Sequence, residues 1–399
     1  MIGFSSGRGG MRVLAAIVVA LGAFAAGAIS ARAQGAFYSN ADPRAAGRAG
    51  ALIRYQPLWG APDGAAAYRI LYRSTGLRGE PIAVSGFVVV PAGPPPPGGR
   101  PIVAWAHPTS GVVPQCAPSL ANFRFRSVQG LRDMLSRGYI VAATDYPGLG
   151  TAGPHPYLVG VSEGRAVLDS VRAARMLPGA YAGRRFAVWG HSQGGQAALY
   201  TGLLAPTYAP DLHLVGVAAA APATELGVLL GKDFNTTGGK NLTAMTLWSW
   251  ARVFDAPIDR VVEPAAMPTV NRLANECIES IFDILARERT GRPLDKDFLK
   301  VTDLVDIEPW RSLLAENTPG ALPPDIPVFL SQGADDHLVL PAVTQDYMSR
   351  LCRAGSAVRM LIMPGVTHAF AAKESAGAAV AWIAERFAGA KAPSDCGGK

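Results

Sequence analysis

The chain has 399 residues, of which 49% are hydrophobic and 17% are charged. This composition suits a globular protein with many buried strands and excludes general disorder. The net charge is +7, but no Lys/Arg cluster is interleaved with aromatic residues, so we expect no nucleic-acid partner. The length fits one large domain that carries an insertion.

The N-terminus has the pattern of a secretory signal peptide. Arg8 and Arg12 precede an apolar run over residues 13–29, and residues 31–33 (Ala-Arg-Ala) form a small-x-small cleavage site. We therefore expect residues 1–33 to be removed after Ala33 and the protein to be secreted, either extracellular or periplasmic. The alternative is an uncleaved membrane anchor, but the run is short and rich in Ala and Gly.

From residue 65 onward, apolar strand-like runs alternate with helical segments. Strands are predicted at residues 65–74, 81–91, 101–107, 139–145, 185–190, 213–222, 326–333 and 358–365. Helices are predicted at residues 162–177, 193–204, 341–355 and 379–389, with a further helical stretch that ends near residue 137. The first two strands should pair antiparallel. The later strands are apolar throughout, which indicates a parallel sheet covered by helices on both faces.

The alternation is interrupted after the strand at residues 213–222. Residues 223–320 are helical in pattern, contain Trp and Met, and show no clear strand. The predicted fold class is therefore α/β, with a core of residues 34–222 and 321–399 and a helical lid or cap inserted at 223–320. Residues 34–65 lack periodicity and are predicted to be an extension that lies over the core.

Three stretches match G-x-S-x-G, the pattern of a nucleophilic serine on a sharp turn between a strand and a helix. GFSSG, at residues 3–7, has no strand before it and lies in the predicted signal peptide. GVSEG, at residues 160–164, follows two prolines that disfavour a central strand, so Ser162 is predicted to cap a helix, with Glu163 near its positive end.

GHSQG, at residues 190–194, has the strand sequence RFAVW before it and a helical sequence after it. Ser192 is therefore the predicted nucleophile. Because a helix begins at this point, the backbone N–H of Gln193 should face the site where an oxyanion forms.

A serine nucleophile needs a base, and histidine is the usual one. Of the six histidines, only His368 follows a strand at its C-terminal end, where such sheets place functional loops. The acid should lie on the loop after the preceding strand, where Asp336 is the first choice and Asp335 the alternative. The order Ser, Asp, His along the chain is that of α/β-hydrolases.

Two more loop residues are of interest. Thr109 follows the first inner strand, and its backbone N–H is the predicted second oxyanion donor, because Pro108 has none. Asp145, in DYPGLG, is predicted to be structural, with its carboxylate binding backbone N–H groups of the turn.

The four cysteines, Cys116, Cys277, Cys352 and Cys396, suit an exported protein with two disulfides, and three pairings are open. The sequence has no C-x-x-C pair and its histidines are scattered, so we expect neither a metal site nor a cofactor.

Together these motifs resemble the secretory lipase family of α/β-hydrolases, which includes fungal lipase A-like enzymes and secreted bacterial relatives. The resemblance runs from about residue 37 to 390, and is carried by ILYRS, IAVSGFVVVP, AHPTSGVVPQCAPS, TDYPGLGTAGPHPYLVGVSEGRAVLDSVRAAR, GHSQGG, QGADDHLV and the late His368. The family places its acid fourth in G-x-x-D, which supports Asp336. The sequence differs from the family at His107-Pro108, where such loops usually have His-Gly.

The resemblance also implies that Cys116 pairs with Cys277 and that Cys352 pairs with Cys396. The leading hypothesis is a secreted lipase or esterase that works through an acyl-enzyme. In this hypothesis the insertion forms a lid and acyl-binding tunnel that touches a lipid interface transiently. An ordinary helical cap with its own core is an alternative for the insertion. A peptidase or amidase on the same residues, or a non-catalytic binding protein, are the alternatives for the function.

Overall fold

The structure, a computed structural model, describes residues 1, 37–38, 47–231 and 236–397. Residues 2–33 of the predicted signal peptide therefore lie outside the described residues. The chain divides into a short N-terminal unit, Met1–Asp42, and a large unit, Pro43–Lys399. The large unit contains both the predicted core and the predicted insertion.

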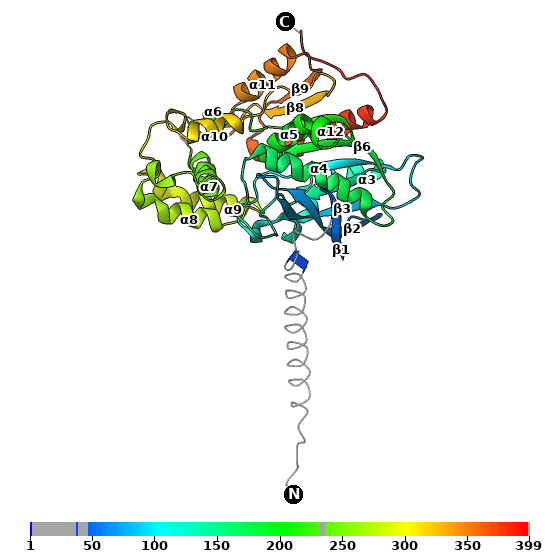
Figure 1. Cartoon of the computed structure of the whole chain (residues 1–399), viewed down its shortest axis with the longest axis horizontal. Coiled ribbons are helices and arrows are strands. Elements are labelled where there is room, and N and C mark those ends of the chain that lie inside the picture. Colours follow the sequence, from blue (N-terminus) through cyan, green and yellow to red (C-terminus); the bar gives the residue numbers. More distant parts are fainter. Residues whose placement is uncertain (2–36, 39–46, 232–235, 398–399) are drawn as a thin grey trace. The chain divides into compact units, whose positions relative to one another are not determined.

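The centre of the large unit is a mixed sheet of nine described strands, in the order β1-β2-β3-β5-β4-β6-β7-β8-β9 (Figure 1). The strands are β1 (Leu52–Leu58), β2 (Ala65–Thr75), β3 (Pro81–Pro91), β4 (Arg100–Ala106), β5 (Ile140–Thr144), β6 (Ala182–His191), β7 (His213–Ala220), β8 (Val328–Gly333) and β9 (Val358–Met363). Strands β1, β2, β3 and β5 pair antiparallel, and the pairs from β5 to β9 are parallel. The α/β class and the mostly parallel sheet are confirmed.

One strand was not predicted. Strand β1 lies inside the segment that was read as an extension, and it pairs with β2 at the edge of the sheet. Its sequence, LIRYQPL, is partly exposed over most of its length. An edge strand that buries little carries no strong apolar pattern, which is why sequence periodicity missed it.

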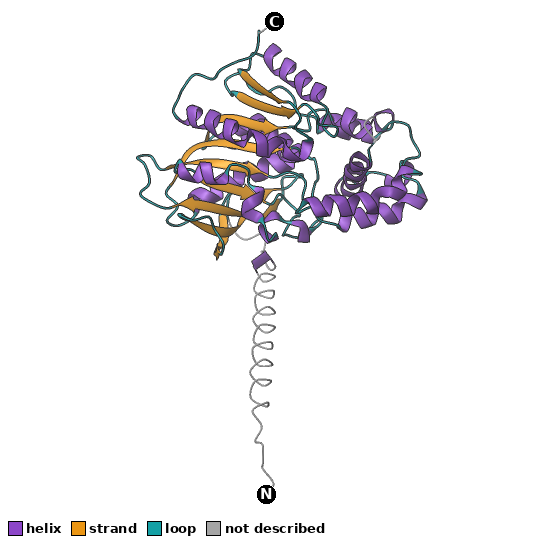
Figure 2. Cartoon of the chain, turned by 180° about the vertical axis from the view of Figure 1, so that it is seen from behind, coloured by secondary structure: helices purple, strands orange, loops and turns teal. Residues whose placement is uncertain are grey.

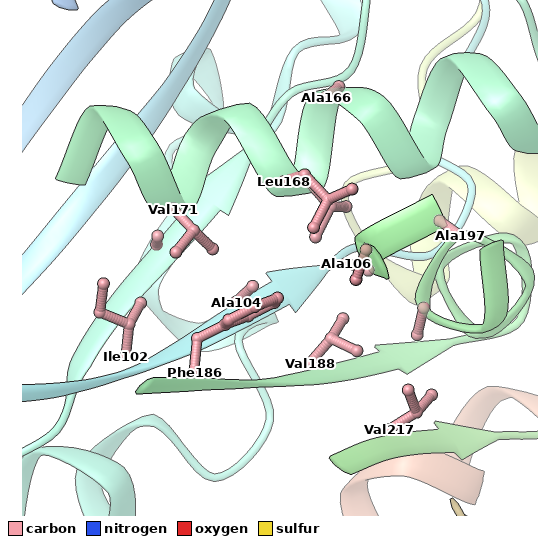
Figure 3. Packing of buried hydrophobic residues seen from close by; sticks show 14 of the residues in the cluster. Ile102, Ala104, Ala106, Ala166, Leu168, Val171, Phe186, Val188, Ala197 and Val217 are labelled. Atoms are coloured by element: carbon pink, nitrogen blue, oxygen red, sulfur yellow. The ribbon is translucent and has the colours of Figure 1, made fainter. Parts of the chain in front are cut away.

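Helices cover both faces of the sheet (Figure 2). They are α3 (Leu131–Ser136), α4 (Gly160–Met176), α5 (Gln193–Tyr208), α11 (Pro341–Arg353) and α12 (Ala371–Phe387). Side chains of β4 alternate between the two faces. Ile102 and Ala104 pack in one cluster with α4 and α5, whereas Trp105 packs in another with α3 and α12. Figure 3 shows part of the first of these layers, and the strand residues labelled in it are all buried.

Helix α4 differs from its prediction at one end. It begins at Gly160, and its N-cap position is Val159, so the prediction that Ser162 caps this helix was wrong. Ser162 instead lies buried in the first turn. The connection between β4 and β5 was predicted as helical, and it consists of two short 3-10 turns followed by the short helices α2 (Arg124–Ser127) and α3.

The insertion is helical, as predicted. Its helices are α6 (Leu226–Gly231), α7 (Thr237–Val253), α8 (Met267–Asn275), α9 (Ile281–Gly291) and α10 (Trp310–Glu316). A capping box of Ser280 and Asp283 begins α9. The insertion has a core of its own, built around Trp250 and Trp310, whose rings are stacked 6.4 Å apart. Within the described residues no helix is long and apolar enough to cross a membrane.

Both disulfides that the resemblance implied are present. Cys116 is bonded to Cys277 and Cys352 to Cys396. The first joins the loop after β4 to the insertion, between α8 and α9. The second joins α11 to the C-terminal tail.

Candidate active site

Ser192 lies on a sharp turn between β6 and α5. Its backbone has φ 56° and ψ −118°, a left-handed conformation that is strained for any residue other than glycine. The Ser192 N–H donates to Ala220 O on β7 at 2.9 Å. The buried strand β6 and its neighbour β7 therefore hold the serine at the carboxyl edge of the sheet.

The glycines of GHSQG allow the close packing around this turn. A Cβ atom at Gly190 would lie 2.0 Å from Gly194 O, and one at Gly194 would lie 2.0 Å from Ala106 O. Because these neighbours are backbone atoms, they cannot give way as a flexible side chain can. The pattern thus requires glycine at both positions for steric reasons.

His368 and Asp336 complete a continuous chain of hydrogen bonds to Ser192. His368 Nε2 lies 2.8 Å from Ser192 Oγ, and His368 Nδ1 lies 2.8 Å from Asp336 Oδ2. His368 follows β9, and Asp336 follows β8. The structure therefore brings the three predicted residues together from three separate loops at one edge of the sheet.

The Asp336 carboxylate is almost fully buried but well supplied with donors. Its Oδ1 accepts the N–H groups of Leu338 and Val339, each at 2.9 Å, and its Oδ2 accepts Gln332 Nε2 at 3.0 Å. Burial alone would raise the pKa of Asp336, but the nearby His368 and the backbone donors outweigh it and hold the pKa below 3.8. Asp336 is thus kept ionised and oriented toward the imidazole.

The alternative acid, Asp335, is exposed to solvent, and its N–H donates to Val366 O. Of the two neighbouring aspartates, only Asp336 makes a hydrogen bond to His368. This hydrogen bond favours Asp336 over Asp335 as the acid that orients His368.

The two predicted oxyanion donors border the same site. Gln193 is the first residue of α5, and Thr109 lies in the loop after β4, with its Oγ1 2.9 Å from the Tyr157 hydroxyl. Among the described residues, neither backbone N–H donates to a protein acceptor. A Cβ atom added at Gly194 would lie only 2.6 Å from His107 O. The loop after β4 therefore packs directly against the start of α5.

A pocket opens beside Ser192. Its cavity volume is about 30 Å³. It is lined mainly by apolar side chains from the insertion and from the loop after β8: Tyr157, Leu158, Ser192, Gln193, Ala223, Leu226, Leu229, Leu230, Gly239, Leu242, Leu338 and Val339. An apolar pocket with a nucleophile at its wall suits a group such as an acyl chain.

Two residues near the site were not predicted. The first is His191, whose Nε2 donates to His368 O at 3.0 Å and whose ring lies 5.0 Å from the His368 ring. Burial and, to a smaller extent, the nearby His368 lower the pKa of His191 to about 3, so the ring is a neutral donor. The other is Gln332, which links Asp336 to Thr344 and Val339. No sequence pattern singles out either residue.

Asp145 is fully buried, but the prediction that its carboxylate binds backbone N–H groups of its own turn was wrong. Its carboxylate accepts Ser85 Oγ at 2.6 Å, the Ser119 N–H at 2.8 Å and the Ser119 hydroxyl. These bonds connect β3 to the loop after β4. Within the described part of the chain, no group of three or more His, Cys, Asp or Glu side chains could hold a metal ion.

Comparison with known proteins identifies the family. The sequence model of the secretory lipase family matches residues 128–395. A probable inactive lipase of Mycobacterium tuberculosis is 25% identical over 345 residues, which are 82% of this chain and 75% of the relative. A secreted triacylglycerol lipase of Malassezia globosa is 28% identical over 353 residues, which are 83% of this chain and 74% of the relative.

Solved structures agree on the fold. Lipase A of Candida antarctica, in its closed state, superposes with a TM-score of 0.70 at 20% identity, covering 88% of this chain and 85% of that chain. The rice cell wall degrading esterase LipA of Xanthomonas oryzae superposes with a TM-score of 0.67 at 20% identity, covering 86% and 98%. Both are α/β folds of the hydrolase kind. The chain therefore belongs to the secretory lipase family.

Proposed function

We propose that the protein is a secreted serine hydrolase that cleaves carboxylic esters, including those of lipids. The observation that carries the proposal is the pair of 2.8 Å hydrogen bonds that connects Ser192 through His368 to Asp336. Family membership supports lipase or esterase activity in general. Secretion is supported by the family and by the two disulfides, which form and persist in oxidising compartments.

The arrangement supplies a nucleophile, a base and an orienting acid. Ser192 Oγ attacks the ester carbonyl carbon as its proton passes to His368 Nε2. His368 then gives the proton to the departing alkoxide, the C–O bond breaks, and an acyl-enzyme is left on Ser192. Water, deprotonated by His368, attacks this second ester and releases the carboxylic acid. Asp336 holds the imidazole in the required tautomer and stabilises its charged form.

Negative charge develops on the carbonyl oxygen in both steps. The backbone N–H groups of Gln193 and Thr109 have no protein acceptor among the described residues. Gln193 follows Ser192 directly, and Thr109 lies in the β4 loop that packs against the start of α5. We propose that both N–H groups donate hydrogen bonds to the oxyanion, which the positive end of the α5 dipole also stabilises.

The insertion is proposed to bind the acyl part of the substrate. Leu226, Leu229, Leu230 and Leu242 of α6 and α7 line the pocket at Ser192. In this conformation the cavity has a volume of about 30 Å³. A long acyl chain would therefore enter only if α6 moves, which is the behaviour expected of a lid.

Two alternatives remain to be tested. The same triad can cleave amides, and a related protein bears the name of a probable inactive lipase. Purified protein should be assayed with nitrophenyl esters of two, four, eight and sixteen carbons and with the matching nitroanilides, beside Ser192→Ala. Ser162→Ala, in the second G-x-S-x-G stretch, is the matched control because Ser162 lies in α4 away from this hydrogen-bond chain.

We expect ester cleavage by the wild type and by Ser162→Ala within about twofold of each other. Ser192→Ala should lose at least about a thousandfold in kcat. Absence of ester turnover, or equal turnover by Ser192→Ala, would overturn the proposal in favour of a binding protein. Faster cleavage of the nitroanilides would make the protein an amidase.

A further inference from the structure

The second G-x-S-x-G stretch, GVSEG, places a carboxyl group behind the proposed oxyanion donor. Glu163 lies in the first turn of α4, and its side chain is completely buried. Its Oε1 accepts the Leu158 N–H at 3.0 Å and Gln193 Nε2 at 2.7 Å. The Gln193 side chain thus connects α4 to the residue that begins α5.

The orientation of the Gln193 amide follows from His155. His155 Nδ1 lies 2.9 Å from Pro147 O, which can only accept, so Nδ1 carries the proton and Nε2 has the lone pair. Burial lowers the pKa of His155 to about 3, so the ring is neutral. The atom 2.8 Å from His155 Nε2 must therefore be the amide nitrogen of Gln193, and its second N–H is directed to Glu163.

Among the residues that the structure describes, no Lys or Arg forms an ion pair with Glu163. The titratable groups that face it are His155 and Tyr157 from the loop before α4, Tyr146 from the loop after β5, and Tyr200 from α5. His155 Nε2 lies 3.8 Å away but is not protonated, so the two do not form an ion pair. Among the described residues, Oε2 has no hydrogen-bond partner.

A buried carboxylate without a counter-charge is costly, and a protein avoids the cost by protonating the group. Oε1 then serves as the carbonyl oxygen that accepts both N–H groups, and Oε2 carries the proton. Burial raises the pKa of Glu163 to about 8, although the hydrogen bonds from Gln193 and Leu158 act in the opposite direction.

On the basis of the proposed ester hydrolysis, we infer that Glu163 is a positioning residue which, as a neutral acid, holds Gln193 so that its backbone N–H receives the oxyanion. Loss of the Glu163 proton places an uncompensated negative charge behind the oxyanion site. That charge opposes the charge of the transition state and slows both acylation and deacylation. The substrate itself is neutral, so KM changes little.

The test is the pH dependence of kcat and KM for a short-chain nitrophenyl ester between about pH 6 and about pH 9.5. The hydrolysis seen with Ser192→Ala is subtracted at each pH. Glu163→Gln keeps the accepting oxygen and the shape but cannot ionise. Asp169→Asn is the matched control, because Asp169 is a buried carboxyl on the same helix whose partners are Ser74, Arg172 and Tyr208.

In the wild type and in Asp169→Asn, kcat should fall as the pH rises through about 8, with KM unchanged. Glu163→Gln should retain its neutral-pH kcat within about threefold and lose this alkaline fall. An alkaline fall that persists in Glu163→Gln would overturn the inference while leaving the proposed function intact. Failure of the proposed function would instead appear as equal activity of the wild type and Ser192→Ala.

A second measurement does not depend on activity. Between pH 4.5 and about 8, unfolding releases the Glu163 proton, so the wild type loses stability as the pH rises through this window. Glu163→Gln has no such loss, and its denaturant midpoint relative to the wild type should increase steadily from pH 4.5 to about 8. A difference that stays constant over this range would mean that Glu163 is ionised in the folded protein, and would also overturn the inference.

Discussion

Asp335 and Asp336 are adjacent in the sequence but differ in solvent exposure and in hydrogen bonding. Asp335 is exposed, whereas Asp336 is 1% exposed and bound to two backbone N–H groups, to Gln332 and to His368. The low pKa of Asp336 is a consequence of these donors. A carboxylate that stays ionised throughout the working pH range can stabilise a protonated imidazole, and a solvated neighbour cannot replace it.

Asp336→Asn should therefore lower kcat by about a thousandfold or more, because an amide at this position favours the wrong tautomer of His368. Asp335→Asn removes the same charge one residue away and should keep kcat within about twofold. Both variants should be assayed with the same ester, and their folding checked by thermal unfolding. If Asp335→Asn were the more damaging of the two, the assignment of the acid would be wrong.

The three residues of the proposed triad, which the structure brings into one chain of hydrogen bonds, could be singled out from the sequence because each has a local signal. Ser192 is flanked by glycines between a strand and a helix, and His368 and Asp336 each follow an apolar strand. Glu163 and His155 have no such signal. Their roles depend on contacts with Gln193, which is 30 and 38 residues away along the chain, and only the packing of α4 against α5 creates those contacts.

At the scale of elements, apolar runs predicted the inner strands well, because strands buried on both faces have little freedom in composition. Strand β1 escaped for the opposite reason, since it lies at the edge and is stabilised by hydrogen bonds to β2 more than by burial. Helix α4 begins earlier than its pattern suggested. Val159 at its N-cap makes no side-chain capping bond, so the usual start signal is absent.

Substitution by alanine should have opposite effects on stability at two helical glycines. A Cβ at Gly195 in α5 would lie 2.8 Å from Pro222 Cα, whereas Gly377 in α12 is exposed and has no atom within 4 Å of such a Cβ. Gly195→Ala should push α5 from β7, cost roughly 1–3 kcal/mol and lower kcat with it. Gly377→Ala should gain about 0.5–1 kcal/mol at unchanged kcat.

Denaturant unfolding of both variants, paired with the ester assay, measures these effects. Equal stability of the two variants would show that α5 is not tightly packed against β7. A loss of kcat in Gly377→Ala would show that α12 affects the site, which nothing in its position predicts.

In the molecule as a whole, the proposed function requires the insertion to be held against the core and still to admit substrate. Hydrogen bonds join the insertion to the core at several places, among them Tyr157 with Trp250 and Tyr200 with Glu316, and one of these places lies beside the proposed oxyanion loop. The Cys116–Cys277 disulfide joins the β4 loop to the insertion, and the Ile278 N–H donates to Ser110 O at 2.8 Å. Since Ser110 follows Thr109, the same connection also restrains the proposed second oxyanion donor.

The two disulfides should therefore differ in function although they are similar in stability. They span 161 and 44 residues, which corresponds to about 5 and about 4 kcal/mol of lost chain entropy in the unfolded state. Removing either pair by double substitution with alanine should lower the denaturant midpoint by a comparable amount. Only removal of Cys116–Cys277 should also lower kcat, by about tenfold, because the loop that contains Thr109 is then no longer bonded to the insertion.

The Cys352–Cys396 variant is the matched control, since its bond joins α11 to the tail. Equal kcat in the two folded variants would mean that β3, through Ser85 and Asp145, holds the oxyanion loop without help from the insertion.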